Sequence, residues 1–556
     1  MKYINIITII LIVGAAIFTC ILMFNPTILD ITEKGTLYES TLFDKDEITT
    51  VNITISDENW ADIQENPLEE EYHLCDITIN GDTYESVAIR TKGASSLSSV
   101  SSSDSDRYSF KIKADEYVGG QSFDGLDEFV LNNCYLDTTY MKEYLSYEMM
   151  DYIGVDTPLY SYAAISINGE YFGLYMMVEA PEEDFLERLY GSDYGELYKP
   201  DSISGQMGGQ MGVGDIMPDA AVNTTAFDNQ IDMTTFNMTG MPAMNITMGG
   251  QMGAGEIMPD AIVNTTAFDN QTDRTTFNMT DRPAMNMMMP AMGGAAGGVG
   301  SMSESGGGAD LVYTDDDTDS YSQIFDNAVT DTSTSDEKRV ITALKNLNEG
   351  TDLETYVDVD EVLRYFAANT AVVSLDSYVS SMKHNYYLYE DDGQISILPW
   401  DFNQGFGGFG ISEASEAVNF PIDTPVASGI SLEDRPLIGV LLENEDYTEL
   451  YHAYLEQIAT GFYGDSFDER IAAIDTLISD YVESDPTAFY TYDEYQTAIQ
   501  TLSEYGDLRA ESILGQLNGT IPSTEVEQTA NPDLLVDTSG LNFSSMGSTG
   551  GGGGGR

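Results

Sequence analysis

Two aspartates and an asparagine in the second half of the chain carry oxygen atoms of the kind that phosphoryl transfer requires. Asp376 follows an apolar stretch of helical periodicity, Asn385 begins a predicted strand nine residues later, and Asp401 ends the next predicted strand. This reaction needs a carboxylate beside the acceptor hydroxyl, oxygen ligands for Mg²⁺ and cations on the phosphates. The order helix, loop, strand, turn, strand predicts that the three side chains lie together at the mouth of one ligand site. Taken singly, loop aspartates and asparagines more often cap turns.

The scarce basic residues gather in the first half of the chain. The sequence has 22 lysines and arginines against 93 aspartates and glutamates, yet Arg90, Lys92, Lys111 and Lys113 fall within 24 residues. Such a positive island could bind phosphate, helped by backbone N–H groups of the glycine–serine loop at 93–96. The alternative is that these side chains lie on strand faces and pair with surface carboxylates.

The formal net charge of -71 argues against a nucleic-acid partner, because so acidic a surface repels polyanions. The same field repels nucleotide, so an ATP site would need a divalent cation and a local cluster of lysine or arginine. Three cysteines are too few for a structural zinc site or a disulfide framework. Cys75 and Cys134 either pair in an oxidising compartment or remain buried free thiols.

An apolar run from Tyr3 to Phe24 follows Lys2 at the start of the chain. About 20 such residues suffice to cross the hydrocarbon core of a bilayer. With a basic residue before the run and acidic residues after it, we expect residues 1–25 to form an uncleaved signal anchor. The protein would then be a single-pass protein of the cell membrane, with its bulk outside the cytoplasm. A cleaved signal peptide, and hence a secreted protein, is the alternative.

The pattern of predicted elements changes between the two halves of the chain. Residues 37–200 are rich in predicted strands and contain one helix over 139–153, whereas residues 310–520 contain mostly helices and one strand pair. The expected fold class is therefore α+β, with a small strand-rich lobe on a larger helical lobe. The cleft between the lobes would be the default ligand site.

Two segments differ in composition from these lobes. Residues 201–309 are rich in methionine and glycine and contain a duplicated stretch that starts at Gly209 and again at Gly250. Two copies are too few for a solenoid, so we interpret this segment as a disordered insertion. Residues 521–556, which end in GGGGGR, are predicted to form a flexible tail.

A succession of motifs in this chain resembles the CotH family of atypical protein kinases. In chain order the motifs are IRTKGASS, YSFKIKAD, LNNCYLD, INGEYFGLYMMVE, GELYKP, LDSYVSSMKHNYYLY and LPWDFNQGF. They are specific in combination and extend from about residue 50 to 460, apart from the insertion. The resemblance implies an atypical, kinase-like two-lobed fold. It also implies an enzyme that uses ATP and Mg²⁺ (or Mn²⁺) to phosphorylate serine in secreted, surface or spore-coat proteins.

The resemblance also implies roles for single positions. Asp376 would be the catalytic-loop aspartate, Asp401 the metal ligand of the Trp-Asp-Phe segment, and Asn385 an auxiliary metal or phosphate ligand. Lys113, or its same-face neighbour Lys111, would be the phosphate-binding lysine on the third strand.

Further positions follow from the same resemblance. The helix over 139–153 should supply an acid that orients the lysine, with Glu143 or Glu148 as candidates. Glu179 falls where the chain leaves the sheet, so it would line the nucleotide pocket. Asn403 stands where family members often carry a second acid, which leaves a two-metal arrangement in doubt.

The sequence thus predicts a membrane-anchored, extracytoplasmic kinase that transfers the γ-phosphoryl group of ATP to serine or threonine. Its partners would be ATP, a secreted, surface or coat protein and the membrane. The alternative is a non-catalytic protein that keeps the fold, either a pseudokinase-type surface binder or a structural coat component. An external location favours this alternative because ATP is scarce there. The presence of Asp376, Asn385, Asp401 and Lys113 favours the kinase.

Overall fold

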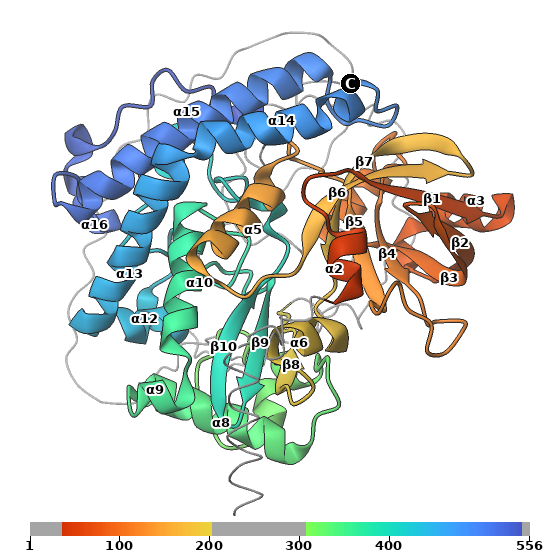
Figure 1. The fold of residues 1–556 in the computed structure, drawn as a ribbon. Helices are drawn as coiled ribbons and strands as arrows, with labels where there is room; N and C mark the ends of the chain where they lie inside the picture. The colour runs from red at the N-terminus through yellow and green to blue at the C-terminus, as the bar shows by residue number, and fades with distance from the viewer. Residues whose placement is uncertain (1–35, 203–306, 548–556) are drawn as a thin grey trace, which may run out of the picture. The chain divides into compact units, whose positions relative to one another are not determined.

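A closed barrel and a group of helices make up the part of the chain that the computed structural model describes, residues 36–202 and 307–547 (Figure 1). All of these residues belong to one structural unit. The predicted α+β class is confirmed. The predicted anchor over 1–25 and the predicted insertion, except for its ends, lie outside the described residues. Within the described ranges, no helix has both the length and the apolar character needed to cross a membrane.

The barrel strands follow the order β1-β2-β3-β4-β5-β7-β6, and a parallel pairing of β1 with β6 closes the ring. The other neighbouring pairs are antiparallel. Asn168 and Gly169 join two of these antiparallel strands, and both residues adopt the left-handed φ (52° and 85°) that a tight two-residue turn needs. The strands are β1 (Thr49–Ile55), β2 (His73–Ile79), β3 (Asp82–Lys92), β4 (Ser109–Lys113), β5 (Glu128–Asn132), β6 (Tyr160–Ile167) and β7 (Glu170–Glu179).

Side chains alternate between the inside and the outside of the barrel, as β4 illustrates. Phe110 and Ile112 are fully buried in the barrel core, whereas Lys111 and Lys113 point outward. Arg90 of β3 lies directly opposite Lys111 in the register. The expected strand-rich lobe is therefore a closed barrel with basic side chains on the outer face of β3 and β4. A kinase-like two-lobed arrangement stays a prediction.

The helical part is built around α10 (Val359–Ala371), most of whose side chains are buried. Helix α5 (Lys142–Ile153) lies between barrel strands in the sequence, yet it packs against α10 and belongs to the helical core. A small sheet of order β10-β9-β8 completes this part. Its strands are β8 (Glu196–Tyr198), β9 (Tyr386–Asp391) and β10 (Gln394–Pro399), so a strand before the predicted insertion pairs with a hairpin after it.

The remaining helices surround these elements. Near the barrel lie α2 (Leu37–Leu42), α3 (Asp57–Glu65), α4 (Ser95–Ser101) and α6 (Glu183–Tyr190). In the helical part the chain continues with α7 (Ser322–Phe325), α8 (Thr334–Glu349), α9 (Leu353–Tyr356), α11 (Ala414–Val418), α12 (Pro436–Leu442), α13 (Glu445–Gln457), α14 (Phe467–Glu483), α15 (Tyr492–Leu517) and α16 (Glu525–Ala530). Helices α12 and α13 are separate, because Asn444 caps the start of α13.

The predicted flexible tail needs a correction. Residues 525–546 form α16 and two short 3₁₀ helices, and Phe543 and Met546 are buried against the body. The apolar side chains of this segment hold it in place. The glycine-rich sequence at the end of the chain had suggested that the whole segment was flexible. The question of Cys75 and Cys134 is also answered, since both are buried free thiols.

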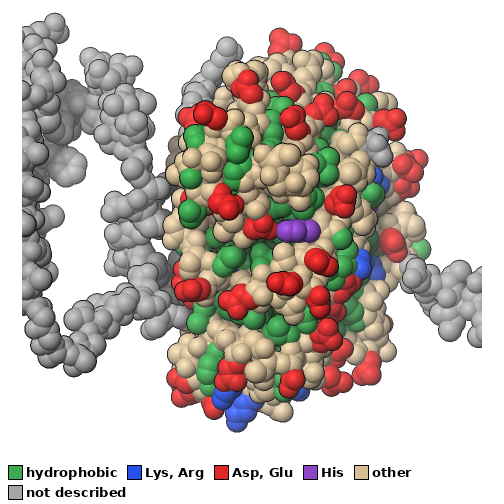
Figure 2. All heavy atoms as spheres, turned by 90° about the vertical axis from the view of Figure 1, so that its left-hand side faces the viewer, with side chains coloured by type: hydrophobic (Ala, Val, Ile, Leu, Met, Phe, Trp, Pro, Cys, Tyr) green, Lys and Arg blue, Asp and Glu red, His purple; other side chains and the backbone are tan. Residues whose placement is uncertain are grey.

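Among the charged side chains on the face of the molecule that Figure 2 shows, carboxylates predominate and basic groups are few. Several of the basic residues are engaged in ion pairs. Arg339, for example, contacts Glu390 at 2.6 Å, and Arg364 contacts Asp360 at 2.7 Å. A lysine or arginine without such an engagement therefore stands out in this protein.

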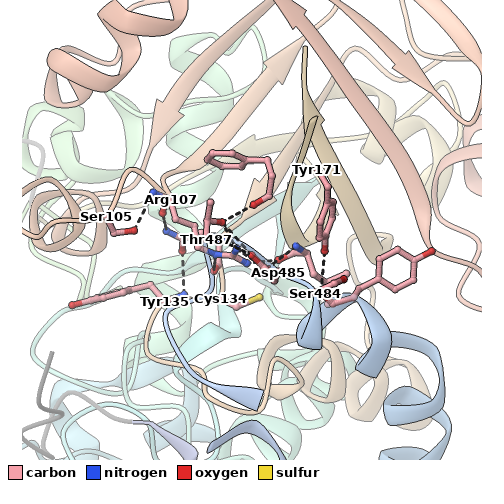
Figure 3. A network of polar contacts seen from close by, with 12 residues as sticks. Ser105, Arg107, Cys134, Tyr135, Tyr171, Ser484, Asp485 and Thr487 are labelled. Atoms are coloured by element: carbon pink, nitrogen blue, oxygen red, sulfur yellow. Dashed lines mark hydrogen bonds and ion pairs between the residues drawn. The ribbon is translucent and has the colours of Figure 1, made fainter. Parts of the chain in front are cut away.

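A buried ion pair joins the barrel to the helical part (Figure 3). Arg107 precedes β4, Asp485 follows α14, and both side chains are inaccessible to solvent. The Arg107 guanidinium lies 2.7 Å from the Asp485 carboxylate, and it also donates to Thr487 Oγ1 at 2.8 Å and to the Asn133 carbonyl at 3.0 Å. The backbone N–H of Leu174 in β7 donates to the same carboxylate at 2.9 Å. The buried charges thus have the additional hydrogen bonds that compensate for their desolvation.

The ion pair also explains a glycine of the INGEYFG motif. A Cβ atom at Gly173 would lie 2.4 Å from the Arg107 guanidinium and 2.9 Å from the Asp485 carboxylate. Both atoms are fixed by their hydrogen bonds, so they cannot move aside. Only glycine lets β7 approach the ion pair this closely.

Replacing Arg107 by methionine should destabilise the protein, because it leaves Asp485 buried without its counter-charge. We expect the free energy of unfolding, measured by urea denaturation, to fall by about 3–5 kcal/mol. Lys345→Ala serves as the control, since it removes an exposed 3.6 Å contact with Asp316 and should leave the unfolding midpoint nearly unchanged. Equal midpoints for the two variants would contradict the role given to Arg107.

Candidate active site

Helix α5 brings two polar side chains into the interior between the barrel and the helices. Its first turn is capped from outside the helix, because the Asp137 carboxylate accepts the backbone N–H groups of Thr139 and Lys142, each at 2.9 Å. The helix is buried along most of its length and carries Glu143 and Tyr147 on its inner side. The position of these two side chains is therefore set by the cap and by the packing of α5.

A chain of hydrogen bonds links a barrel lysine to α5. Lys92, the last residue of β3, donates to Asn132 Oδ1 at 2.8 Å. The Asn132 amide nitrogen lies 3.0 Å from both carboxylate oxygens of Glu143. Burial and the nearby Asp401 raise the pKa of Glu143 to about 8, although Asn132 and Lys92 oppose the shift. The lysine and the helix acid are thus connected through an asparagine.

Asp401 follows β10 by two residues and lies near Glu143. Its backbone adopts a left-handed conformation (φ 57°), and its N–H donates to the Tyr147 hydroxyl at 3.1 Å. The Oδ1 atom of its carboxylate is buried and has no hydrogen-bond partner. A buried oxygen of this kind normally has a partner, so it fits a site for a cation. The described residues contain no group of three or more His, Cys, Asp or Glu side chains that could hold a metal by themselves.

The second predicted acid, Asp376, pairs with a histidine. Its Oδ1 atom lies 2.6 Å from His384 Nε2, and its backbone carbonyl accepts from the Asn385 side chain at 2.9 Å. Burial disfavours a charged imidazole, but the hydrogen bond to Asp376 and the charges of Asp376 and Asp401 together raise the pKa of His384. The structure therefore brings Asp376, Asn385 and His384 together. Asp401 lies close enough to act on the same imidazole.

Lys199 is a basic residue of this site for which the sequence suggested no role. Its ammonium group lies 5.3 Å from the centre of the Trp400 ring and 5.4 Å from that of Tyr387, and Lys92 lies 5.5 Å from the centre of the same Trp400 ring. The Lys199 side chain is exposed to solvent, although many protein atoms lie around it. Burial and the nearby Lys92 and Lys111 lower the pKa of Lys199 to about 8. Its place in the GELYKP motif, in a chain poor in lysine, was the available signal.

A second ionic cluster adjoins these lysines. Lys111 contacts Glu128 at 2.5 Å across β4 and β5. Burial and Glu128 raise the pKa of Glu182, just before α6, to about 7, and Lys111 and Lys199 counteract this shift. Glu182 is a further residue that sequence reasoning missed. The signal for it was weak, because it is one of several acids after β7.

The other predicted residues are engaged elsewhere. Arg90 pairs with Glu70, and Glu148 pairs with Arg470. Lys113 lies 3.7 Å from Asp115 and 3.8 Å from Glu116 on the outer surface. Glu179 is fully buried, contacts Arg188 at 2.5 Å and accepts from the Tyr38 hydroxyl at 2.7 Å. Of the two helix acids it is therefore Glu143, and of the predicted lysines Lys92 and Lys111, that lie near Asp401 and Lys199.

The family comparison can now be set beside this geometry. Residues 89–232 and 286–513 match the family model described as CotH kinase protein. The chain belongs to this family. The matched ranges contain Lys92, Glu143, Lys199, Asp376 and Asp401, so the clustered residues all lie within the family region. No curated protein matches the sequence. Membership in the CotH kinase family supports a kinase-like enzyme.

The lowered pKa of Lys199 can be measured directly. A lysine with a pKa of about 8 is half neutral at that pH, whereas Lys113, whose pKa is raised by Asp115 and other acids, stays charged. We expect acetylation by a dilute acylating reagent, followed by mass spectrometry, to modify Lys199 with a midpoint near pH 8 and Lys113 only at much higher pH. The same midpoint for both lysines would contradict the lowering of the Lys199 pKa by burial and by the nearby Lys92 and Lys111.

Proposed function

We propose that the protein is an extracytoplasmic atypical protein kinase that transfers the γ-phosphoryl group of ATP to serine or threonine of secreted, surface or coat proteins. The observation that carries this proposal is the buried, unpartnered carboxylate oxygen of Asp401, which lies among the lysines of an otherwise acidic protein. Family membership supports the kinase class. The apolar run from Tyr3 to Phe24 supports a membrane anchor.

The lysines near Trp400 suit the polyphosphate of a nucleotide. Burial and repulsion by Lys92 and Lys111 together lower the pKa of Lys199, and Asp401 and Asp201 oppose the shift only in part. An anion among the lysines would relieve this repulsion. Trp400 and Tyr387 are apolar surfaces beside the same lysines. We therefore place the phosphates of ATP next to Lys92 and Lys199.

The metal would be held by Asp401 and Asn385. Mg²⁺ takes few protein ligands and completes its octahedron with water and phosphate oxygens, which agrees with the small set of oxygen ligands offered here. When bound, it would neutralise charge on the phosphates that otherwise meet a field of carboxylates. The Tyr147 hydroxyl accepts the Asp401 N–H and so fixes the backbone of Asp401 in its left-handed conformation.

Asp376 would receive the acceptor hydroxyl. Its side chain is 17% exposed, so it can be reached from solvent, and His384 fixes one of its oxygen atoms. The second oxygen would orient the serine or threonine hydroxyl and accept its proton during transfer. His384 would share that charge, since its raised pKa reflects the same carboxylate.

Phosphoryl transfer by the purified protein tests the proposal. Radiolabelled ATP, Mg²⁺ or Mn²⁺ and a serine-rich acceptor should give a labelled acceptor with the wild type. Asp401→Asn, Asp376→Asn and Lys92→Met should each reduce the rate by about 100-fold or more, the usual cost of removing one electrostatic group from a reaction centre.

Asp392→Asn is the matched control, because this aspartate is exposed in the β9–β10 turn and should retain the wild-type rate. Failure of the wild type to label any acceptor with either metal would support the alternative, a non-catalytic binding protein. Wild-type activity in Asp401→Asn would refute the site while sparing the reaction. A larger loss for Lys113→Met than for Lys92→Met would restore Lys113 as the phosphate-binding lysine.

A further inference from the structure

The last described residues of the chain pack behind the candidate active site. Residues 541–547, here called the C-terminal strap, lie beyond residue 513, where the family match ends. Leu541, Phe543 and Met546 of the strap are buried, and Ser545 bonds to Thr501 of α15 at 2.8 Å. The strap is therefore fixed along α15, and its two ends touch different parts of the site.

One end of the strap holds the first turn of α5. The Lys142 ammonium donates to the Gly547 carbonyl at 2.5 Å, and the Thr138 N–H donates to the Met546 carbonyl at 3.2 Å. Gly547 has a left-handed φ of 80°, and a Cβ there would lie 2.5 Å from the Leu136 carbonyl. Lys142 is fully buried, and burial lowers its pKa to about 8 although Asp137 opposes the shift. The next residue along α5 is Glu143.

The other end of the strap supports residues 405–408, here called the glycine loop, which follow Asp401. A Cβ at Gly407, which has a left-handed φ of 70°, would lie 2.9 Å from the Phe543 ring. The Phe543 ring in turn lies 6.2 Å from that of Tyr505, which lies 6.0 Å from the ring of Phe406. Phe543 thus closes a packed aromatic layer under the loop.

The same two elements also meet each other at the site. A Cβ at Gly405 would lie 2.8 Å from Ser146 Oγ of α5, and Tyr147 of α5 accepts the Asp401 N–H. The relative position of α5 and the loop therefore decides how close Glu143 lies to Asp401. These two carboxyl groups already interact, since Asp401 raises the pKa of Glu143.

We propose that the C-terminal strap is a positioning element that fixes the first turn of α5 and the glycine loop at one spacing. In this way it holds the carboxyl groups of Glu143 and Asp401 close to each other. The catalytic consequence rests on the proposed function, whereas the structural consequence does not. Phe543 and Lys142 are the positioning residues, because each acts through an element that carries a site residue and neither touches the reacting atoms.

The test compares Phe543→Ala with Leu534→Ala in the full chain. Leu534 precedes the strap and is 53% exposed, so its truncation is a matched control. Hydrogen exchange followed by mass spectrometry reports on the backbone without any substrate. We expect Phe543→Ala to speed exchange at residues 405–408 and 138–146 and to leave the barrel strands unchanged. Phe543→Leu, which refills part of the space, should restore most of the protection.

Kinetics give the second readout. A misplaced site should lower kcat by about 10- to 100-fold while the KM for ATP changes little, because the phosphate-binding lysines are not moved. Lys142→Met should show the same pattern and, in the exchange experiment, affect 138–146 first. Leu534→Ala should match the wild type in both experiments.

The outcomes separate the two proposals. Exchange that rises throughout the molecule, or nowhere, in Phe543→Ala would overturn the positioning role and leave the strap as ordinary packing. Unchanged kcat together with locally faster exchange would overturn its catalytic consequence. A wild type without any phosphoryl transfer would refute the proposed function. Faster exchange confined to residues 405–408 and 138–146 in Phe543→Ala would still establish the positioning role of the strap.

Discussion

The buried Arg107–Asp485 pair is the contact on which the arrangement of the site depends. Asp485 lies in the helical part after α14, Arg107 and Leu174 lie on the barrel side, and the Asp485 carboxylate binds both of them. Neither charge can leave without exposing its partner to an apolar interior, so the two parts are held in one orientation. That orientation places the outer face of β3 and β4, with Lys92 and Lys111, beside Lys199 and Asp401. The candidate site exists only where these surfaces meet.

The acidic composition of the protein makes the grouping of lysines at the candidate site important for binding an anion. With a net charge of -71, an anionic nucleotide is repelled by most of the surface, and the acidic face in Figure 2 illustrates the problem. Burial and the charges of Lys92 and Lys111 lower the pKa of Lys199, although Lys111 is itself paired with Glu128. Cations crowded without full compensation favour an anionic ligand. The charge pattern and the unpartnered oxygen of Asp401 thus point to the same polyphosphate and metal.

Local patterns predicted the elements well and the long-range contacts poorly. The alternation of Phe110 and Ile112 with Lys111 and Lys113, and the turn at Asn168-Gly169, depend on neighbouring residues and were predictable. Closure of the barrel depends on β1 pairing with β6, more than a hundred residues away, for which no local pattern exists. Glu143 and Glu148 are five residues apart on α5 and point to different partners, Asn132 and Arg470, so spacing alone could not choose between them. Lys199 was missed because only the small sheet brings it beside Trp400.

The assignment of Asp401 as the metal ligand of a nucleotide site is the central claim, and binding of Mn²⁺ measures it most directly. Electron paramagnetic resonance can follow Mn²⁺ titrated into the protein with and without a non-hydrolysable ATP analogue. The wild type should bind Mn²⁺ together with the analogue more tightly than either Asp401→Asn with the analogue or the wild type without it. Equal Mn²⁺ affinity in wild type and Asp401→Asn, with the analogue present, would contradict the site.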